Sequence, residues 1–111
     1  MDKIKRYEAI ILQIMEEYAA IRYANLDATN EMIVDRENHR YQVVTIGWDG
    51  YKRVHTATLH FDIKDGKIWI QQDQTEHGIA NDLVEAGVPK SDIVLNYLLP
   101  EVREELEFAL G

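Results

Sequence analysis

Hydrophobic residues recur every three or four positions over the N-terminal part of the chain. These positions are Ile4, Tyr7, Ile11, Ile14, Tyr18 and Ile21. Because this spacing places side chains along one side of a helix, it predicts a long N-terminal helix. Further apolar residues lie beside the stripe, namely Ile10, Leu12, Met15 and Ala19. Two interpretations of this wide apolar arc stay open: a helix packed deeply on a sheet, or a helix shared between the sheet and another subunit.

The pattern changes to alternation after Asp27, which indicates strands. Alternating polar and apolar runs cover residues 31–36, 41–48, 53–63 and 67–72. Residues 37–40 are rich in turn formers, and the next two connections contain Asp49-Gly50 and Asp65-Gly66. Asp-Gly between alternating runs is a strong hairpin signal, because glycine adopts positive φ without a steric penalty. The sequence therefore predicts a four-stranded antiparallel meander.

Helical spacing returns after the last predicted strand. The apolar positions are Ile79, Ala80, Leu83 and Val84, and Gly87 supplies a left-handed C-terminal stop. A short helix is predicted after Pro100. The predicted fold class is α+β, with a long N-terminal helix and a second helix packed on a four-stranded antiparallel β-meander.

Composition places the chain among folded globular proteins. Its 111 residues allow one hydrophobic core, so residues 1–111 are expected to form a single domain. The 12 Lys and Arg residues against 20 Asp and Glu residues give a formal net charge of -8. Phosphate backbones should be repelled, so direct nucleic-acid binding is not expected.

Cysteine is absent, which removes disulfides, thiolate metal sites and cysteine nucleophiles. A reducing cytoplasm is therefore the expected location. The charged N-terminus leads directly into the predicted helix and resembles neither a signal peptide nor a membrane span.

Acidic residues crowd into the stretch between Asp62 and Asp82, which raises the question of a catalytic centre. Local structure explains them: Asp65 precedes Gly66 in a tight turn, and Asp73 or Thr75 is placed to cap the second helix. No catalytic residue, metal ligand or cofactor is therefore expected. The alternative is a magnesium-dependent nuclease centre that uses Asp62, Asp65 and Lys67.

The second face of the predicted sheet is the candidate partner surface. It combines aromatic, β-branched and polar residues, namely Tyr41, Val43, Thr45, Thr56, Thr58, His60 and Trp69. Aromatic anchors with little charge are typical of protein interfaces. Two interpretations stay open: this face binds a partner, or the segment from Ile93 onward folds across it. Self-association is also expected, because Trp48, Trp69 and the helix offer more apolar surface than a small domain hides.

Several motifs together resemble the XisI proteins, the fdxN element excision controlling factors. The similar segments are Gly47-Trp48-Asp49-Gly50, Asp62 to Gln71, Asp73 with Thr75-Glu76, Gly78-Ile79-Ala80, Leu83, Gly87-Val88-Pro89-Lys90, Asp92-Ile93-Val94-Leu95 and Pro100-Glu101-Val102-Arg103. The resemblance spans nearly the whole chain. It departs from the family pattern after Arg103, where only Phe108-Ala109 is similar.

The resemblance implies a cyanobacterial protein that is encoded beside a XisH-like partner, itself related to nucleases. In the namesake system both proteins are needed for the excision of a DNA element during heterocyst differentiation. The expected function is a non-enzymatic accessory factor that binds the XisH-like partner. The candidate binding residues are Tyr41, Val43, Thr58, His60 and Trp69. Direct DNA binding and the nuclease centre are the alternatives.

Overall fold

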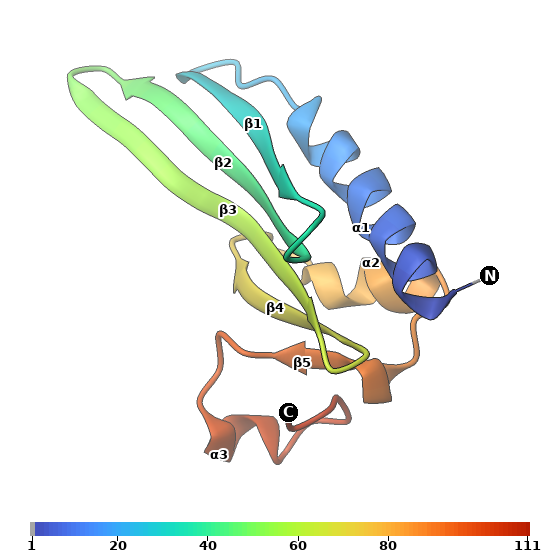
Figure 1. The fold of residues 1–111 in the computed structure, drawn as a ribbon. Coiled ribbons are helices and arrows are strands. Elements are labelled where there is room, and N and C mark those ends of the chain that lie inside the picture. The colour runs from blue at the N-terminus through green and yellow to red at the C-terminus, as the bar shows by residue number, and fades with distance from the viewer. Residues whose placement is uncertain (1) are drawn as a thin grey trace.

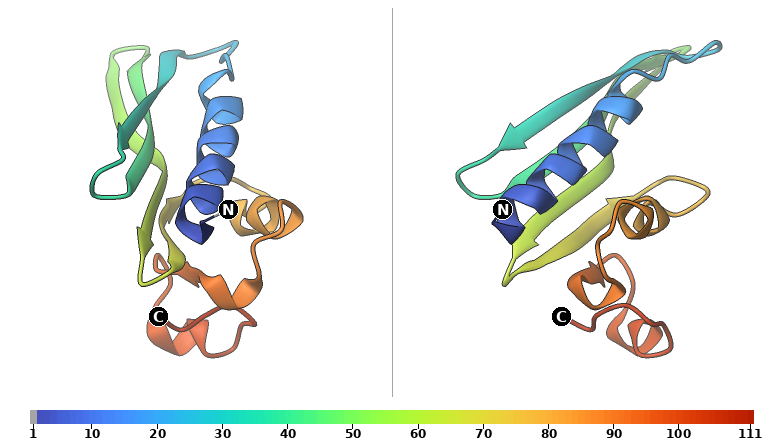
Figure 2. Two further views of the ribbon diagram at one scale, coloured as in Figure 1. Left: turned by 45° about the vertical axis from the view of Figure 1, so that its right-hand side comes forward. Right: turned by 90° about the vertical axis from the view of Figure 1, so that its right-hand side faces the viewer.

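The computed structural model describes residues 2–111, in which two helices cover one face of a five-stranded sheet (Figures 1 and 2). Helix α1 spans Lys3–Ala19, so the predicted N-terminal helix is confirmed. Its cap is Asp2, whose Oδ1 accepts a hydrogen bond from the amide of Ile4 at 3.3 Å. Its buried residues are Tyr7, Ile11, Ile14 and Met15.

Strands β1 to β4 form the predicted meander. Their bounds are Asp27–Asp35, Arg40–Asp49, Lys52–Lys64 and Lys67–Asp73, and each pairs antiparallel with the next. The turn before β4 has positive φ at both Asp65 and Gly66, 54° and 74°, as a two-residue hairpin requires. The turn expected at Asp65-Gly66 is confirmed.

The prediction of a purely antiparallel, four-stranded sheet is wrong. A fifth strand, β5 at Ile93–Leu95, pairs in parallel with β4, and the strand order is β1-β2-β3-β4-β5. Parallel neighbours need a crossover connection, which here contains α2 at Ile79–Glu85 and the short helix η1 at Lys90–Asp92. The segment from Ile93 thus extends the sheet edge, and helix α3 at Pro100–Arg103 follows it.

Two β-bulges change which residues face the helices. In β3, Val43 pairs with Leu59 and Val44 with Ala57, so Thr58 is an extra residue. In β4, His60 pairs with Gln72 and Phe61 with Ile70, so Gln71 is extra. A bulge places neighbouring residues on the same side of the strand and so interrupts alternation. The two faces of the sheet therefore differ from those that simple alternation predicts.

The core lies between the helices and the sheet. Its largest fully buried side chains include Tyr7, Ile11 and Met15 of α1, with Tyr41 and Phe61 of the sheet. Helix α2 contributes apolar residues to the same cluster. None of the helices described within residues 2–111 has the length and hydrophobicity needed to cross a membrane.

Candidate functional site

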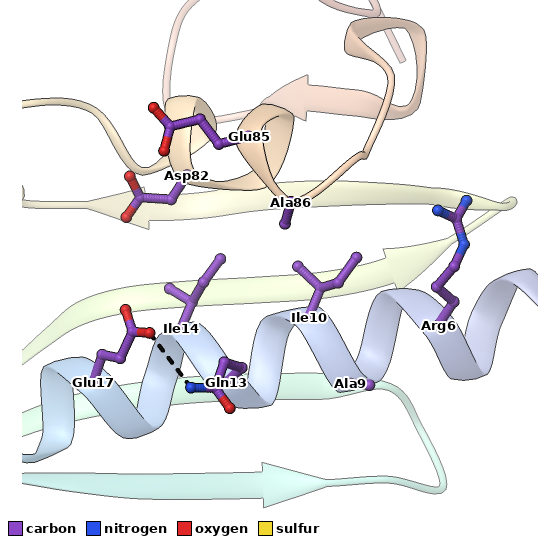
Figure 3. Close-up of a pocket in the computed structure, with 9 residues that line it drawn as sticks. All are labelled: Arg6, Ala9, Ile10, Gln13, Ile14, Glu17, Asp82, Glu85 and Ala86. Carbon is purple, nitrogen blue, oxygen red and sulfur yellow. Dashed lines mark hydrogen bonds between the residues drawn. The ribbon is translucent and has the colours of Figure 1, made fainter.

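A groove of about 590 Å³ separates α1 from α2 on the helical side of the molecule (Figure 3). Helix α1 has 17 residues and α2 only seven, which correspond to about 25 Å and 10 Å of length. The shorter helix therefore leaves much of the flank of α1 uncovered. The residues that line the groove are Arg6, Ala9, Ile10, Gln13, Ile14, Glu17, Asp82, Glu85 and Ala86.

The middle of the groove is apolar. Ile10 and Ile14 of α1 lie between the two helices in Figure 3, and Ala86 faces them from the end of α2. Ile14 belongs to the core, whereas Ile10 is half-buried and packs against its edge. Ala9 and Ala86 are exposed and small, which keeps the groove open. The wide apolar arc of α1 thus serves two surfaces, the sheet and this groove.

The two ends of the groove carry opposite charge (Figure 3). Arg6 lies at one end, and three carboxylates, those of Glu17, Asp82 and Glu85, lie toward the other. Gln13 donates a hydrogen bond to Glu17 at 3.4 Å. Arg22 donates to the carbonyls of Ala19 and Ala20 at the end of α1, so the negative charge of the groove comes from the three carboxylates rather than from the helix dipole. The acidic end therefore favours a cationic group.

A histidine contacts one of the carboxylates at the acidic end of the groove. His77 Nε2 lies 3.2 Å from both carboxylate oxygens of Asp82. Its ring stacks on Tyr18 of α1, with centroids 6.4 Å apart and an angle of 13° between the ring planes. This contact links the segment before α2 to the end of α1.

Two of the predicted partner-binding residues lie in the core, which corrects their expected place on an open face. Tyr41 and Val43 are both 0% exposed and face α1. The same face carries Thr58, whose hydroxyl lies 2.6 Å from that of Thr45. Thr45 in turn donates to Asn30, which bonds the end of α1. Alternation alone does not show which face of β2 is buried, because Val44 and Ile46 are as apolar as Tyr41 and Val43.

His60 and Trp69 lie on the opposite, outer face of the sheet. His60 Nε2 lies 2.9 Å from Asp62, which also accepts a hydrogen bond from Gln71 at 3.1 Å. Trp69 donates from its indole nitrogen to the carbonyl of Lys64 at 3.1 Å, and the Lys64 ammonium lies 4.6 Å from the Trp69 ring. The predicted surface is therefore divided between two faces.

Two residues of the nuclease alternative, Asp62 and Lys67, bind separate partners. Asp62 binds His60 and Gln71, and Lys67 donates to the carbonyl of Gly111 at 2.8 Å. Asp65 lies in the β3–β4 turn. Within residues 2–111, no three histidine or acidic side chains are arranged to hold a metal ion.

Asp73 has the capping role that the sequence predicts. One of its oxygens accepts a hydrogen bond from the amide of Thr75 at 2.8 Å, and the other accepts one from the amide of Ile79 at 2.8 Å. These bonds fix the start of α2 relative to the end of β4. The carboxylate of Asp73 therefore positions one wall of the groove.

A tyrosine of the sheet binds α1, which forms the other wall of the groove. Tyr41 donates to Glu8 of α1 at 2.5 Å, and Arg36 pairs with the other oxygen of Glu8 at 3.1 Å. Burial, together with the hydrogen bond to Glu8, raises the pKa of Tyr41 above its ordinary value. The sequence contains no short-range signal for this contact, because Glu8 and Tyr41 are 33 residues apart.

A second tyrosine links the start of α1 to η1 through a hydrogen bond. Tyr7 donates to Asp92, and Lys3 pairs with the same carboxylate oxygen at 2.9 Å. Burial is the main cause that raises the pKa of Tyr7 to about 12, and the hydrogen bond to Asp92 adds to it. Partial burial opposes ionisation of Asp92, but the bonds from Tyr7 and Lys3 outweigh it and lower the pKa of Asp92.

The arrangement of two helices on one face of a five-stranded mixed sheet is that of XisI-like proteins. A XisI-like protein from Anabaena variabilis has a solved structure with a TM-score of 0.86 and 35% sequence identity, covering 99% of this chain and 100% of that one. The fdxN element excision controlling factor XisI from Anabaena variabilis gives a TM-score of 0.85 and 34% identity, with the same coverage.

The family profile described as "XisI protein" matches residues 1–110. The chain therefore belongs to the XisI family, as its motifs indicated. A comparison with curated proteins gave no match.

Proposed function

We propose that this protein is a non-enzymatic controlling factor that acts by binding another protein, and that the groove between α1 and α2 is its binding surface. One related protein is named an fdxN element excision controlling factor, which supports a role in the programmed excision of a DNA element. The partner that fits this role is a XisH-like protein in the cytoplasm. The observation that carries the proposal is an open apolar groove with a charged end on each side.

The dimensions and charge of the groove specify the segment that it binds. Arg6 and Glu17 are 11 residues apart on α1, which corresponds to about 16 Å, or three helical turns. A partner helix of that length would place apolar side chains at positions i, i+4 and i+7 over Ile10 and Ile14. A basic residue of the partner would lie near Glu17, Asp82 and Glu85. The occupant is therefore an amphipathic helix with a basic end.

A matched pair of alanine substitutions tests this proposal. Ala9 lines the groove, whereas Ala20 lies just beyond α1 and outside it, and both are exposed. Ala9→Arg should fill the groove and weaken binding of a purified XisH-like partner by about tenfold or more, because interface anchors lose their packing. Ala20→Arg adds the same charge and should change the affinity less than about twofold.

Isothermal titration calorimetry with the separately purified partner would measure both affinities. Circular dichroism would establish that each variant is folded. Equal affinities for the two variants would remove the groove from the proposal. Failure of the unmodified chain to bind any XisH-like protein at micromolar concentration would remove the partner.

A further inference from the structure

Strand β3 has an unpaired edge over part of its length, because β4 is much shorter than β3. Strand β4 pairs with β3 only between Leu59 and Lys64. Residues 52–57 of β3 pair with β2 on one side and, within residues 2–111, with no strand on the other. Figure 1 shows this part of β3 as the free margin of a three-stranded arm. The bulge at Thr58 marks the point where the arm separates from β4.

The other two edges of the sheet are less suited to pairing. Strand β1 carries Asp27, Glu31 and Asp35, and antiparallel self-pairing about Glu31 would place these acids opposite one another. Like charges directly opposite each other destabilise a strand pair. The edge of β5 is already occupied, because Val94 forms a parallel bridge with Ala109. Both edges therefore disfavour a second copy of the chain.

The free segment of β3 is complementary to itself. It reads Lys52-Arg53-Val54-His55-Thr56-Ala57 and contains no carboxylate. Antiparallel pairing about His55 places Val54 opposite Thr56 and Arg53 opposite Ala57. Val and Thr are both β-branched residues that are favoured in strands. Ala57 is small and leaves room for the long side chain of Arg53.

The outer face of the arm also favours pairing. Trp48 is 46% exposed and pairs with Arg53, whose guanidinium lies 5.2 Å from the Trp48 ring. Val44 pairs with Ala57 on the same face. Self-pairing would align Trp48 and Arg53 of one copy with Ala57 and Val44 of the other. Val44 is already buried, so the apolar surface that pairing would partly cover is the exposed ring of Trp48.

We propose that two copies of the chain associate through residues 53–57 of β3, antiparallel about a two-fold axis that passes beside His55. The two three-stranded arms then form one continuous sheet. Pairing would replace a weak hydrogen bond on this edge, from Gln74 to Thr56 at 3.4 Å. The edge shares no residue with the groove, so this inference stands independently of the proposed function.

Single cysteines test the register directly, because the chain contains none. At the two-fold axis residue 55 of one copy lies opposite residue 55 of the other, with Cβ atoms about 4.5–5.5 Å apart. His55→Cys should therefore form a disulfide-linked dimer under mild oxidation. Val54→Cys and Thr56→Cys should not, because each lies opposite the other position. Equal linking by all three, or none by His55→Cys, would overturn the proposal.

Light scattering of the unmodified chain gives a second test. The mass in solution should be twice the chain mass of 12.9 kDa at concentrations of tens of micromolar. His55→Glu places two carboxylates together and should return the mass to that of one chain, whereas Ile33→Glu on the β1 edge should leave the dimer intact. A monomeric unmodified chain, or a dimer unaffected by His55→Glu, would overturn the proposal even if partner binding is found.

Discussion

At the residue scale, the turn of α1 from Arg6 to Ala9 connects the core to the groove. Tyr7 and Glu8 bind Asp92 and Tyr41, while Arg6 and Ala9 line the groove. Both hydrogen bonds join a tyrosine hydroxyl to a carboxylate, which makes them stronger than neutral ones. They hold this wall in place before a partner arrives. A preorganised wall lowers the entropy that binding costs.

The Tyr7 hydroxyl should make stability depend on alkaline pH. Its pKa rises from 10.0 to about 12 in the folded protein, so its contribution is complete below pH 10 and disappears between pH 10 and 12. Tyr7→Phe should cost about 1.5–3 kcal/mol of unfolding free energy at pH 8, because the bond to Asp92 is charge-assisted. The difference from the unmodified chain should shrink toward zero by pH 12.

Urea unfolding of both chains at pH 8, 10 and 12 would measure this difference. The other tyrosines and the lysines titrate in both chains, so the comparison isolates Tyr7. A difference that stays constant across this range would show that the hydroxyl group of Tyr7 has no raised pKa.

At the element scale, β1 can approach β2 only because position 47 has no side chain. A Cβ atom at Gly47 would lie 2.1 Å from the carbonyl oxygen of Asp27 and 2.4 Å from the Cα of Ala28. These are backbone atoms and cannot move without shifting β1. The glycine of the Gly47-Trp48-Asp49-Gly50 motif is thus a packing requirement.

Gly47→Ala should separate the start of β1 from β2 and cost at least about 1–3 kcal/mol, as overpacking does. Gly50→Ala is the matched control: no atom lies within 4 Å of its Cβ position, and only its φ of 62° opposes the change. It should cost roughly 1 kcal/mol. Hydrogen exchange should show faster exchange of β1 amides in Gly47→Ala alone, and equal effects of the two substitutions would contradict this explanation.

The sequence predicted the elements with strong periodicity and missed those without it. Helix α1 and the four meander strands follow from spacing and Asp-Gly turns. Strand β5 has three buried residues in a row and lies beyond a crossover, so neither alternation nor a hairpin turn marks it. The bulges at Thr58 and Gln71 depend on pairing between strands, which the pattern of one strand does not contain.

The candidate site was predictable only in part. The wide apolar arc of α1 indicated a second contact surface, and Ile10 belongs to it. The groove also depends on the short length of α2, which the stop at Gly87 predicted, and on the placement of α2 beside α1, which the sequence pattern does not contain. Tyr41 and Val43 were assigned to a partner surface because Val44 and Ile46 made the two faces of β2 equally apolar. The aromatic ring of Tyr41 and the methyl groups of Val43 instead pack in the core.

At the scale of the whole molecule, charge and shape point to two separate surfaces. The net charge of -8 favours a basic partner, and the acidic end of the groove concentrates that charge near apolar side chains. The β3 edge lies on the arm, away from the residues of the groove. A dimer formed through β3 would therefore leave both grooves free. Each copy could then bind one partner molecule.

Hydrogen exchange of the chain with and without a XisH-like partner tests the central claim most directly. The groove walls, residues 6–17 of α1 and residues 79–86 of α2 and its C-cap, should exchange more slowly in the complex, while strand β4 should be unchanged. Slower exchange confined to β4 and the C-terminal segment, with α1 and α2 unaffected, would contradict the groove as the binding surface.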